Sequence, residues 1–196
     1  MDNNDTTLLA SSGDYHQLIC YQKTVIVYDL TYWFCERYME RSKDRTVDQM
    51  VQAARSGKQN IVEGITDGAA SKESELKLLK VAAGSLHELH EDYDDWLRTH
   101  LQPIWAKDSV EMKALWAIGK EHSDSEYFMQ LARTRPPQTT ANIEYCPWND
   151  RTSHLLSRPT DPIQSETVCR EWRIERTDVS RQAAIPATIG ILQQRK

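Results

Sequence analysis

Six consecutive residues near the middle of the chain combine imidazole and carboxylate groups, which are the side chains that most often bind metals or move protons. They are His87, Glu88, Leu89, His90, Glu91 and Asp92. On a helix His87 would meet Glu91, and His90 would meet Asp94, because residues four apart share a face. A metal site in a helical bundle needs inward carboxylates and Glu-x-x-His pairs from several helices, and neither pattern is present. We predict a solvated helix face here, with no metal and no cofactor.

Five basic residues form the other cluster with chemical potential, near the junction of two predicted helices. They are Arg55, Lys58, Lys72, Lys77 and Lys80. They could contact phosphate at the start of the later helix, where backbone N–H groups attract anions. The alternative is ordinary surface charge paired with Glu73 and Glu75. No aromatic residues are interleaved to stack on bases, so we favour surface charge and keep nucleic-acid contact as the alternative.

The remaining polar residues do not suggest an enzyme. Glu63 and Asn60 precede a glycine, but a single carboxylate without a partner acid, base or metal is a weak catalytic signal. We expect Glu63 to cap backbone donors in the loop that follows. For Cys20 and Cys35, which lie in a helical pattern, we predict buried free thiols in a reduced, cytoplasmic setting. The four cysteines of the chain have neither zinc-site nor redox-motif spacing. These cysteines are Cys20, Cys35, Cys146 and Cys169.

Composition limits the remaining classes. The 196 residues are 39% hydrophobic and 27% charged, which is enough for one domain with a modest core. The formal net charge of −5 lacks the global basic field of a dedicated nucleic-acid binder. The polar, acidic N-terminus predicts no signal peptide, and no stretch approaches the ~18 apolar residues of a membrane span.

We expect the fold to be organised around residues 49–64. Apolar or small residues recur there at alternating steps of three and four, which lines one face of a helix over about 46–63. Ala54 and Gly57 leave almost no side chain in the middle of that face, so a second helix can approach closely. Thr46 and Gln49 have the spacing of a capping box. Gly64, followed by Gly68, predicts the end of the helix.

The first predicted helix, over 14–42, is apolar around much of its circumference. Its most regular stripe keeps the 3-4 alternation for three heptads: Leu18, Tyr21, Val25, Tyr28, Tyr32, Cys35 and Met39. A second stripe contains Ile19, Ile26 and Trp33, while Val27, Leu30 and Phe34 lie elsewhere on the helix. A helix with so much apolar surface is central, or it packs on a second chain as well as on its own. We predict that it mediates self-association.

The rest of the chain extends this pattern. Residues 1–13 read as a disordered leader. Ser71 is the expected N-cap of a third helix over about 72–100, which Pro103 ends. Residues 103–143 form a helical insert, and Pro136 and Pro137 suit the first turn of a fourth helix. Short links make neighbouring helices antiparallel, so the predicted class is an all-α, up-down bundle of the four-helix type.

Several blocks of the chain resemble a bacterial four-helix bundle family, in its longer version with a C-terminal suffix domain. The family contains proteins encoded in intervening sequences of ribosomal RNA genes and accessory proteins of diversity-generating retroelements. The likeness covers roughly residues 15–142. It rests on residues 49–50, 53–56, 60–64, 71–72 and 85–89, and on 92–97 for the longer version.

This resemblance implies a four-helix up-down bundle, commonly assembled as a ring of five, and in the retroelement members binding to nucleic acid and a reverse transcriptase. Our first functional prediction is a non-enzymatic assembly module that self-associates through its first helix and the bundle face. The alternative is a nucleic-acid-binding accessory protein of the retroelement or intervening-sequence type.

The expected fourth helix is missing from the sequence after residue 143. Four of the seven prolines fall in 144–196, and no periodicity survives for two turns. Synonymous codons for this segment, read one base later, permit a sequence with helical periodicity, a Gly-Gly stop and a basic end. Our hypothesis is that residues 144–196 are an irregular tail, a frame-shifted version of helix four.

Overall fold

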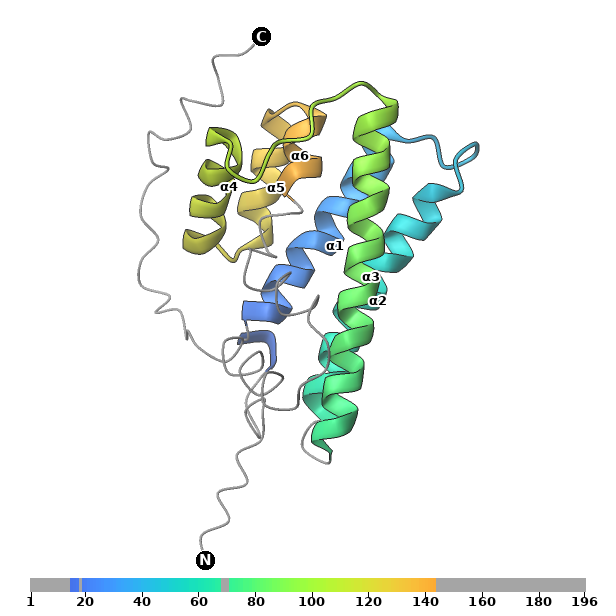
Figure 1. The fold of residues 1–196 in the computed structure, drawn as a ribbon, viewed down its shortest axis with the longest axis vertical. Coiled ribbons are helices and arrows are strands. Elements are labelled where there is room, and N and C mark those ends of the chain that lie inside the picture. The colour runs from blue at the N-terminus through green and yellow to red at the C-terminus, as the bar shows by residue number, and fades with distance from the viewer. Residues whose placement is uncertain (1–14, 18, 68–70, 144–196) are drawn as a thin grey trace, which may run out of the picture.

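The computed structural model describes residues 15–17, 19–67 and 71–143 (Figure 1). Within them a short 3-10 turn, η1 (Tyr15–Gln17), precedes six α-helices, and there is no strand. The long helices are α1 (Ile19–Tyr38), α2 (Thr46–Asp67) and α3 (Lys72–Thr99). The short ones are α4 (Val110–Glu121), α5 (Ser125–Thr134) and α6 (Pro137–Ile143). The all-α class is confirmed for these residues.

Some predictions fall outside the described part of the chain. They concern the leader at 1–13, Leu18, the glycine at 68, and the whole of 144–196 with Cys146 and Cys169. Among the residues that the structure describes, no helix is both long enough and apolar enough to cross a membrane.

The turn between α1 and α2 is closed by residues at its centre. The backbone N–H groups of Lys43 and Asp44 both donate to the Glu40 carbonyl at 2.9 Å. The Asp44 carboxylate then accepts a hydrogen bond from the Thr46 backbone N–H at 2.9 Å, which caps the start of α2. The predicted capping box of Thr46 and Gln49 is therefore wrong, because Thr46 already lies inside the helix.

Helix α2 runs to Asp67, so the predicted end at Gly64 is also wrong. Gly64 is buried against α3, where a Cβ added to it would lie 3.5 Å from the Leu78 Cβ. Packing along α3 thus offsets the roughly 1 kcal/mol that a glycine costs inside a helix. Gly64 allows two helices to approach each other and does not break α2.

Both ends of α3 have defined caps. The Ser71 hydroxyl accepts a hydrogen bond from the Ser74 backbone N–H at 3.3 Å, which confirms the predicted N-cap. At the other end, the Gln102 N–H donates to the Leu97 carbonyl and the Leu101 N–H donates to Arg98, at 2.8 and 3.3 Å. This is the Schellman pattern, and it places Leu101 in the left-handed region at φ 55°.

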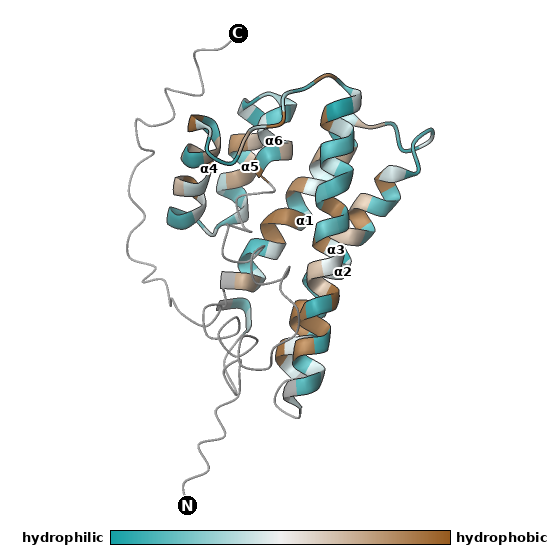
Figure 2. Ribbon diagram, viewed as in Figure 1, coloured by the Kyte–Doolittle hydropathy of each residue, from teal (hydrophilic) through white to brown (hydrophobic). Residues whose placement is uncertain are grey.

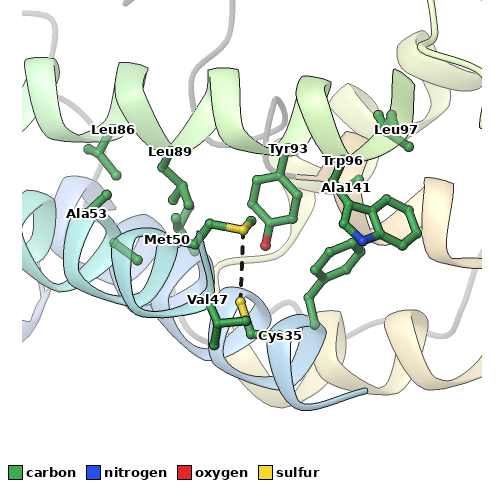
Figure 3. Close-up of a cluster of buried hydrophobic side chains, with 13 residues drawn as sticks. Cys35, Val47, Met50, Ala53, Leu86, Leu89, Tyr93, Trp96, Leu97 and Ala141 are labelled. Carbon is green, nitrogen blue, oxygen red and sulfur yellow. Dashed lines mark hydrogen bonds between the residues drawn. The ribbon is translucent and has the colours of Figure 1, made fainter. Parts of the chain in front are cut away.

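The main core lies between α1, α2 and α3 (Figure 3). Phe34 of α1 forms edge-on ring contacts with Tyr93 and Trp96 of α3, with centroids 5.0 and 4.8 Å apart. The Tyr93 hydroxyl donates to the Thr31 hydroxyl at 3.1 Å inside this core. The other buried members include Val47, Met50, Ala53 and Ala54 of α2 and Leu86 and Leu89 of α3.

A second core lies on the opposite side of α1, where α4, α5 and α6 gather (Figure 1). Apolar residues from all four helices fill it, including Ile26, Leu30, Leu115, Phe128, Leu131 and Ile143. Two polar contacts join the insert to α1. The Lys23 ammonium donates to the carbonyls of Gly119 and His122 at the end of α4, and the Ser125 hydroxyl donates to the Asp29 carboxylate. Helix α1 therefore supports both halves of the described fold.

Helix α6 begins at Pro137, as predicted for a proline at the first helical position. It lies against both cores, because Ala141 belongs to the main core and Ile143 to the second. The five residues from Thr139 to Ile143 are all buried. The polar Asn142 side chain is satisfied there, since its Oδ1 accepts from the Trp105 backbone N–H at 3.2 Å.

Candidate interaction surface

Helix α1 does not bury the stripe whose spacing is most regular. The inner side of α1 in the main core is formed by Val27, Phe34 and Cys35, and the second core takes Ile26 and Leu30. Of the residues of this stripe that the structure describes, only Cys35 is buried, while Val25, Tyr28 and Met39 are half-buried and Tyr32 is 42% exposed. Tyr21 is half-buried beside the rings of Tyr15 and His16 of η1.

These residues lie on the side of α1 that borders α2. We define the α1–α2 face as Val25, Tyr28, Tyr32 and Met39 of α1 together with Val51 of α2. Val25 and Tyr32 belong to none of the buried clusters, and Tyr28, Met39 and Val51 only border the main core. Figure 2 shows hydrophobic residues along α1. The face is therefore apolar surface that the described chain leaves partly uncovered.

An open groove of about 620 Å³ runs along one end of this face, between the end of α1 and the start of α2. Apolar side chains form its walls and charged side chains form its rim. The lining residues are Tyr32, Cys35, Glu36, Met39, Glu40, Arg41, Ser42, Val47 and Val51. Val51 was not singled out from the sequence, although its spacing of four from Val47 places both on the side of α2 that faces α1.

Charged groups along the rim are largely paired with one another. The Arg41 guanidinium donates to the Asp48 carboxylate at 2.8 Å, and Lys43 donates to Glu40 at 2.9 Å. A hydrogen bond with Glu36, followed by the negative charge of that carboxylate, raises the pKa of the Tyr32 hydroxyl. The Tyr32 hydroxyl therefore stays protonated as a hydrogen-bond donor at neutral pH.

Cys35 lies at the bottom of the groove and is not a nucleophile. Its side chain is 2% exposed, and its Sγ lies 4.0 Å from the Met50 sulfur (Figure 3). Burial, with the nearby charges of Asp44 and Asp92, raises the pKa of the Cys35 thiol to about 12. The protonated thiol is unreactive and packs as a small apolar side chain. Cys20 and Cys35 are both free thiols, as predicted, but only Cys35 is buried and Cys20 is half-buried.

The five predicted phosphate-contact residues separate into two positions on the bundle. On α2, Arg55 is exposed and the Lys58 ammonium lies 4.0 Å above the centre of the Tyr28 ring. On α3, Lys77 and Lys80 are exposed one turn apart, while the side chain of Lys72 lies outside the described part. Glu75, a suggested surface partner, is 0% exposed and belongs to the interior.

The histidine cluster lies along one side of α3. The His87 Nε2 is 3.9 Å from Glu91 on the exposed surface, and the His90 Nε2 is 3.8 Å from Asp94 where both are half-buried. Among the described residues, no three His, Cys, Asp or Glu side chains are arranged to hold a metal. Burial, and then the charges of Asp95 and Glu88, raise the pKa of the neighbouring Asp92 carboxyl.

Glu63 and Asn60 do not form a polar site at a loop. Glu63 lies inside α2, a full turn before its end, with an exposed side chain, so its predicted capping role is wrong. The Asn60 amide donates to the Ser56 carbonyl at 2.8 Å within the same helix. Ser56 in turn shares a 2.9 Å hydrogen bond with Ser85 of α3, which makes these polar groups part of the helix contact.

No protein-family model, curated protein or solved structure matches this chain. The resemblance to the bacterial four-helix bundle family therefore stays a prediction. The α1–α2 face combines an apolar stripe, an open groove and a charged rim.

Proposed function

We propose that the protein is a non-enzymatic helical assembly module that self-associates through the α1–α2 face. One observation carries this proposal: the heptad-regular stripe of α1 is the side that the two cores leave partly uncovered. Sustained 3-4 spacing is the pattern by which one helix packs along another. In this chain that spacing continues over Val25, Tyr28, Tyr32 and Met39, which the described helices cover only in part.

The energetic argument concerns large side chains. Complete burial of an aromatic or aliphatic side chain stabilises by about 1.5–3 kcal/mol, so each half-exposed member of the face keeps part of that free energy for a partner. From Val25 to Met39 the face is about 21 Å long, at 1.5 Å per helical residue. Interfaces of this modest size are typical of reversible association, and we expect dissociation constants in the micromolar range.

The wider architecture that supports this proposal is an up-down four-helix bundle. In this interpretation α1, α2 and α3 are its first three helices, and α6 is the beginning of the fourth. Helix α6 contributes Ala141 to the same core as Phe34 and Tyr93, which is the place a fourth helix would occupy. The resemblance adds the expectation of a closed homo-oligomer, commonly a ring of five.

Sedimentation velocity of the full 196-residue chain, between about 1 and 200 µM, tests self-association. We expect an oligomer in the wild type that the variant Tyr32→Lys dissociates, because a lysine would be buried against apolar groups. Val81→Lys is the matched control, since Val81 is 46% exposed on α3 away from this face. A monomer throughout the range, or equal dissociation by both variants, would contradict the proposal.

Nucleic-acid binding is the second candidate, favoured by Lys77 and Lys80. Both are exposed on one side of α3, and neither forms an ion pair among the described residues. If these lysines contact phosphates, the wild type should shift RNA or DNA in a gel at low salt, and added salt should weaken the complex. Lys77→Glu with Lys80→Glu should abolish the shift, while the same changes at Lys113 and Lys120 of α4 should not. No shift at low salt removes this candidate.

A further inference from the structure

Two exposed residues of opposite charge border the α1–α2 face. Glu36 lies on α1, one turn after Tyr32, and Arg55 lies on α2, one turn after Val51. Neither forms an ion pair within the described residues. The other charged groups of the rim are occupied, because Arg41 pairs with Asp48 and Lys43 pairs with Glu40.

The relative positions of these two residues follow from the antiparallel contact of α1 with α2. Cys35 is level with Met50 across the contact, since their sulfur atoms are 4.0 Å apart. Tyr28 is level with Lys58, whose ammonium lies 4.0 Å from the ring centre. Arg55 is therefore close to the level of Tyr32, whereas Glu36 lies beyond it toward the groove. The face has an acidic corner on α1 and a basic corner on α2.

We infer that the partner on this face is a second copy of the chain, related by a twofold axis near Tyr32, with Glu36 of each copy paired to Arg55 of the other. This inference rests on the proposed self-association and specifies its geometry. A twofold contact uses the same surface on both subunits, so each pairing it contains occurs twice. The two Tyr32 side chains then lie at the centre, where α1 of one copy crosses α1 of its partner.

Charge complementarity is the reason for choosing a second copy over another partner. A foreign partner requires an independent match to an acidic corner, a basic corner and the aromatic side chain between them. A second copy supplies that match from the same sequence, because a twofold rotation places the basic corner of one copy opposite the acidic corner of the other. A ring of five would instead join this face to a different surface, and Glu36 and Arg55 would not meet.

Charge exchange in the full chain tests the pairing. Glu36→Arg and Arg55→Glu should each weaken self-association at least about tenfold, because like charges would face each other twice in every dimer. The double variant carrying both changes should recover wild-type affinity. Mixing the two single variants should also give a heterodimer, in which both facing pairs again have opposite charge. Sedimentation gives the affinities, and native mass spectrometry with one variant isotopically labelled identifies the heterodimer.

Glu88→Arg on α3 and Lys113→Glu on α4, which are exposed positions with matched charge changes, should leave the association unchanged. Circular dichroism checks that every variant is folded. A wild-type dimer with no recovery in the double variant, or no heterodimer on mixing, overturns this geometry and leaves self-association standing. A ring of five also overturns the twofold arrangement. A monomeric wild type overturns both this inference and the proposed function.

Discussion

Helix α2 makes two contacts of opposite character. Against α3 it uses small residues: Gly57 packs under Leu86, and the hydroxyls of Ser56 and Ser85 are 2.9 Å apart. Against α1 it presents larger side chains, and an open groove remains between Met39 and Val47. The first interface is closed within the chain, whereas the second keeps apolar surface exposed.

The difference shows how one helix can serve both folding and association. Small residues let two backbones approach closely, so the neighbouring side chains fill the space and exclude water. Large residues hold the backbones of α1 and α2 further apart at the groove, and the side chains along its edges have contacts on one side only. Such an edge adds little to the fold, but it can be covered by a partner.

The largest difference in stability is expected between alanine variants of two methionines, one in the main core and one at the edge of the groove. Met50→Ala removes a fully buried side chain from the main core and should lower the free energy of unfolding by about 2–5 kcal/mol. Met39→Ala, at the half-buried edge of the groove, should cost less than about 1 kcal/mol and should weaken self-association instead. Urea denaturation and sedimentation measure the two effects. Equal losses of stability would show that the groove is as well packed as the core.

The bottom of the groove should respond to alkaline pH. The pKa of Cys35 is raised from 9.0 to about 12 by burial, so the unfolded chain releases this proton at a lower pH than the folded chain does. Its contribution to stability should be complete below about pH 9 and should fall by up to about 1.4 kcal/mol per pH unit up to about pH 12.

The variant Cys35→Ala isolates that contribution from the titration of lysines and tyrosines. Its stability should decline less steeply with pH than that of the wild type when both are followed by urea denaturation. If the two curves are parallel, or if Cys35 reacts rapidly with iodoacetamide at neutral pH, the thiol is not buried in solution.

Two glycines sharpen the description of the closed interface. A Cβ on Gly57 would lie 2.5 Å from the Leu86 Cγ, whereas a Cβ on Gly84 would have no atom within 4 Å. Each Gly→Ala change should gain up to about 1 kcal/mol from helix propensity. The difference in stability between the two variants therefore measures the cost of overpacking at Gly57, about 1–3 kcal/mol. In thermal and urea unfolding, Gly84→Ala should be more stable than the wild type and much more stable than Gly57→Ala. Adding Leu86→Ala to Gly57→Ala should reduce the strain.

The smallest expected effect lies at the end of α3, away from both interfaces. Leu101 is 91% exposed and adopts φ 55°, a conformation that costs little only for glycine. Leu101→Gly should therefore raise the free energy of unfolding by about 0.5–1 kcal/mol with no change in self-association. A decrease in stability would mean that the Leu101 side chain makes contacts in solution that its exposure does not indicate.

The sequence predicted the helices of this fold better than it predicted their faces. The close approach at Gly57 followed from small residues at helical spacing, and the serine cap of α3 followed from its neighbours. The inner face of α1 could not be chosen correctly, because apolar residues surround that helix and periodicity alone does not say which side has partners. Val27, Leu30 and Phe34 became core because the insert and α3 pack on them, which depends on contacts distant in the chain.

Other misses have local causes. Gly64 was expected to end α2, but burial against α3 outweighs its low helix propensity. Nothing in the sequence predicted the left-handed conformation of Leu101. That position after a helix usually holds glycine, and a leucine there looks like any other exposed residue. The groove was missed because it needs the end of α1 and the start of α2 together, although Val47 and Val51 could have marked its α2 side.

The hydrogen bond between Tyr93 and Thr31 fixes the register of α3 against α1. Most of the main core is apolar, and apolar side chains tolerate sliding by one helical turn, about 5.4 Å. Such a slide would bring the Tyr93 hydroxyl to the level of Val27 or Cys35, and the Val27 side chain in particular cannot accept a hydrogen bond. Leaving a buried hydroxyl without a partner costs about 1–3 kcal/mol, a penalty that every misaligned packing of these helices would incur. One buried pair of hydroxyls thus selects a single alignment among several that the hydrophobic effect alone would leave nearly equal.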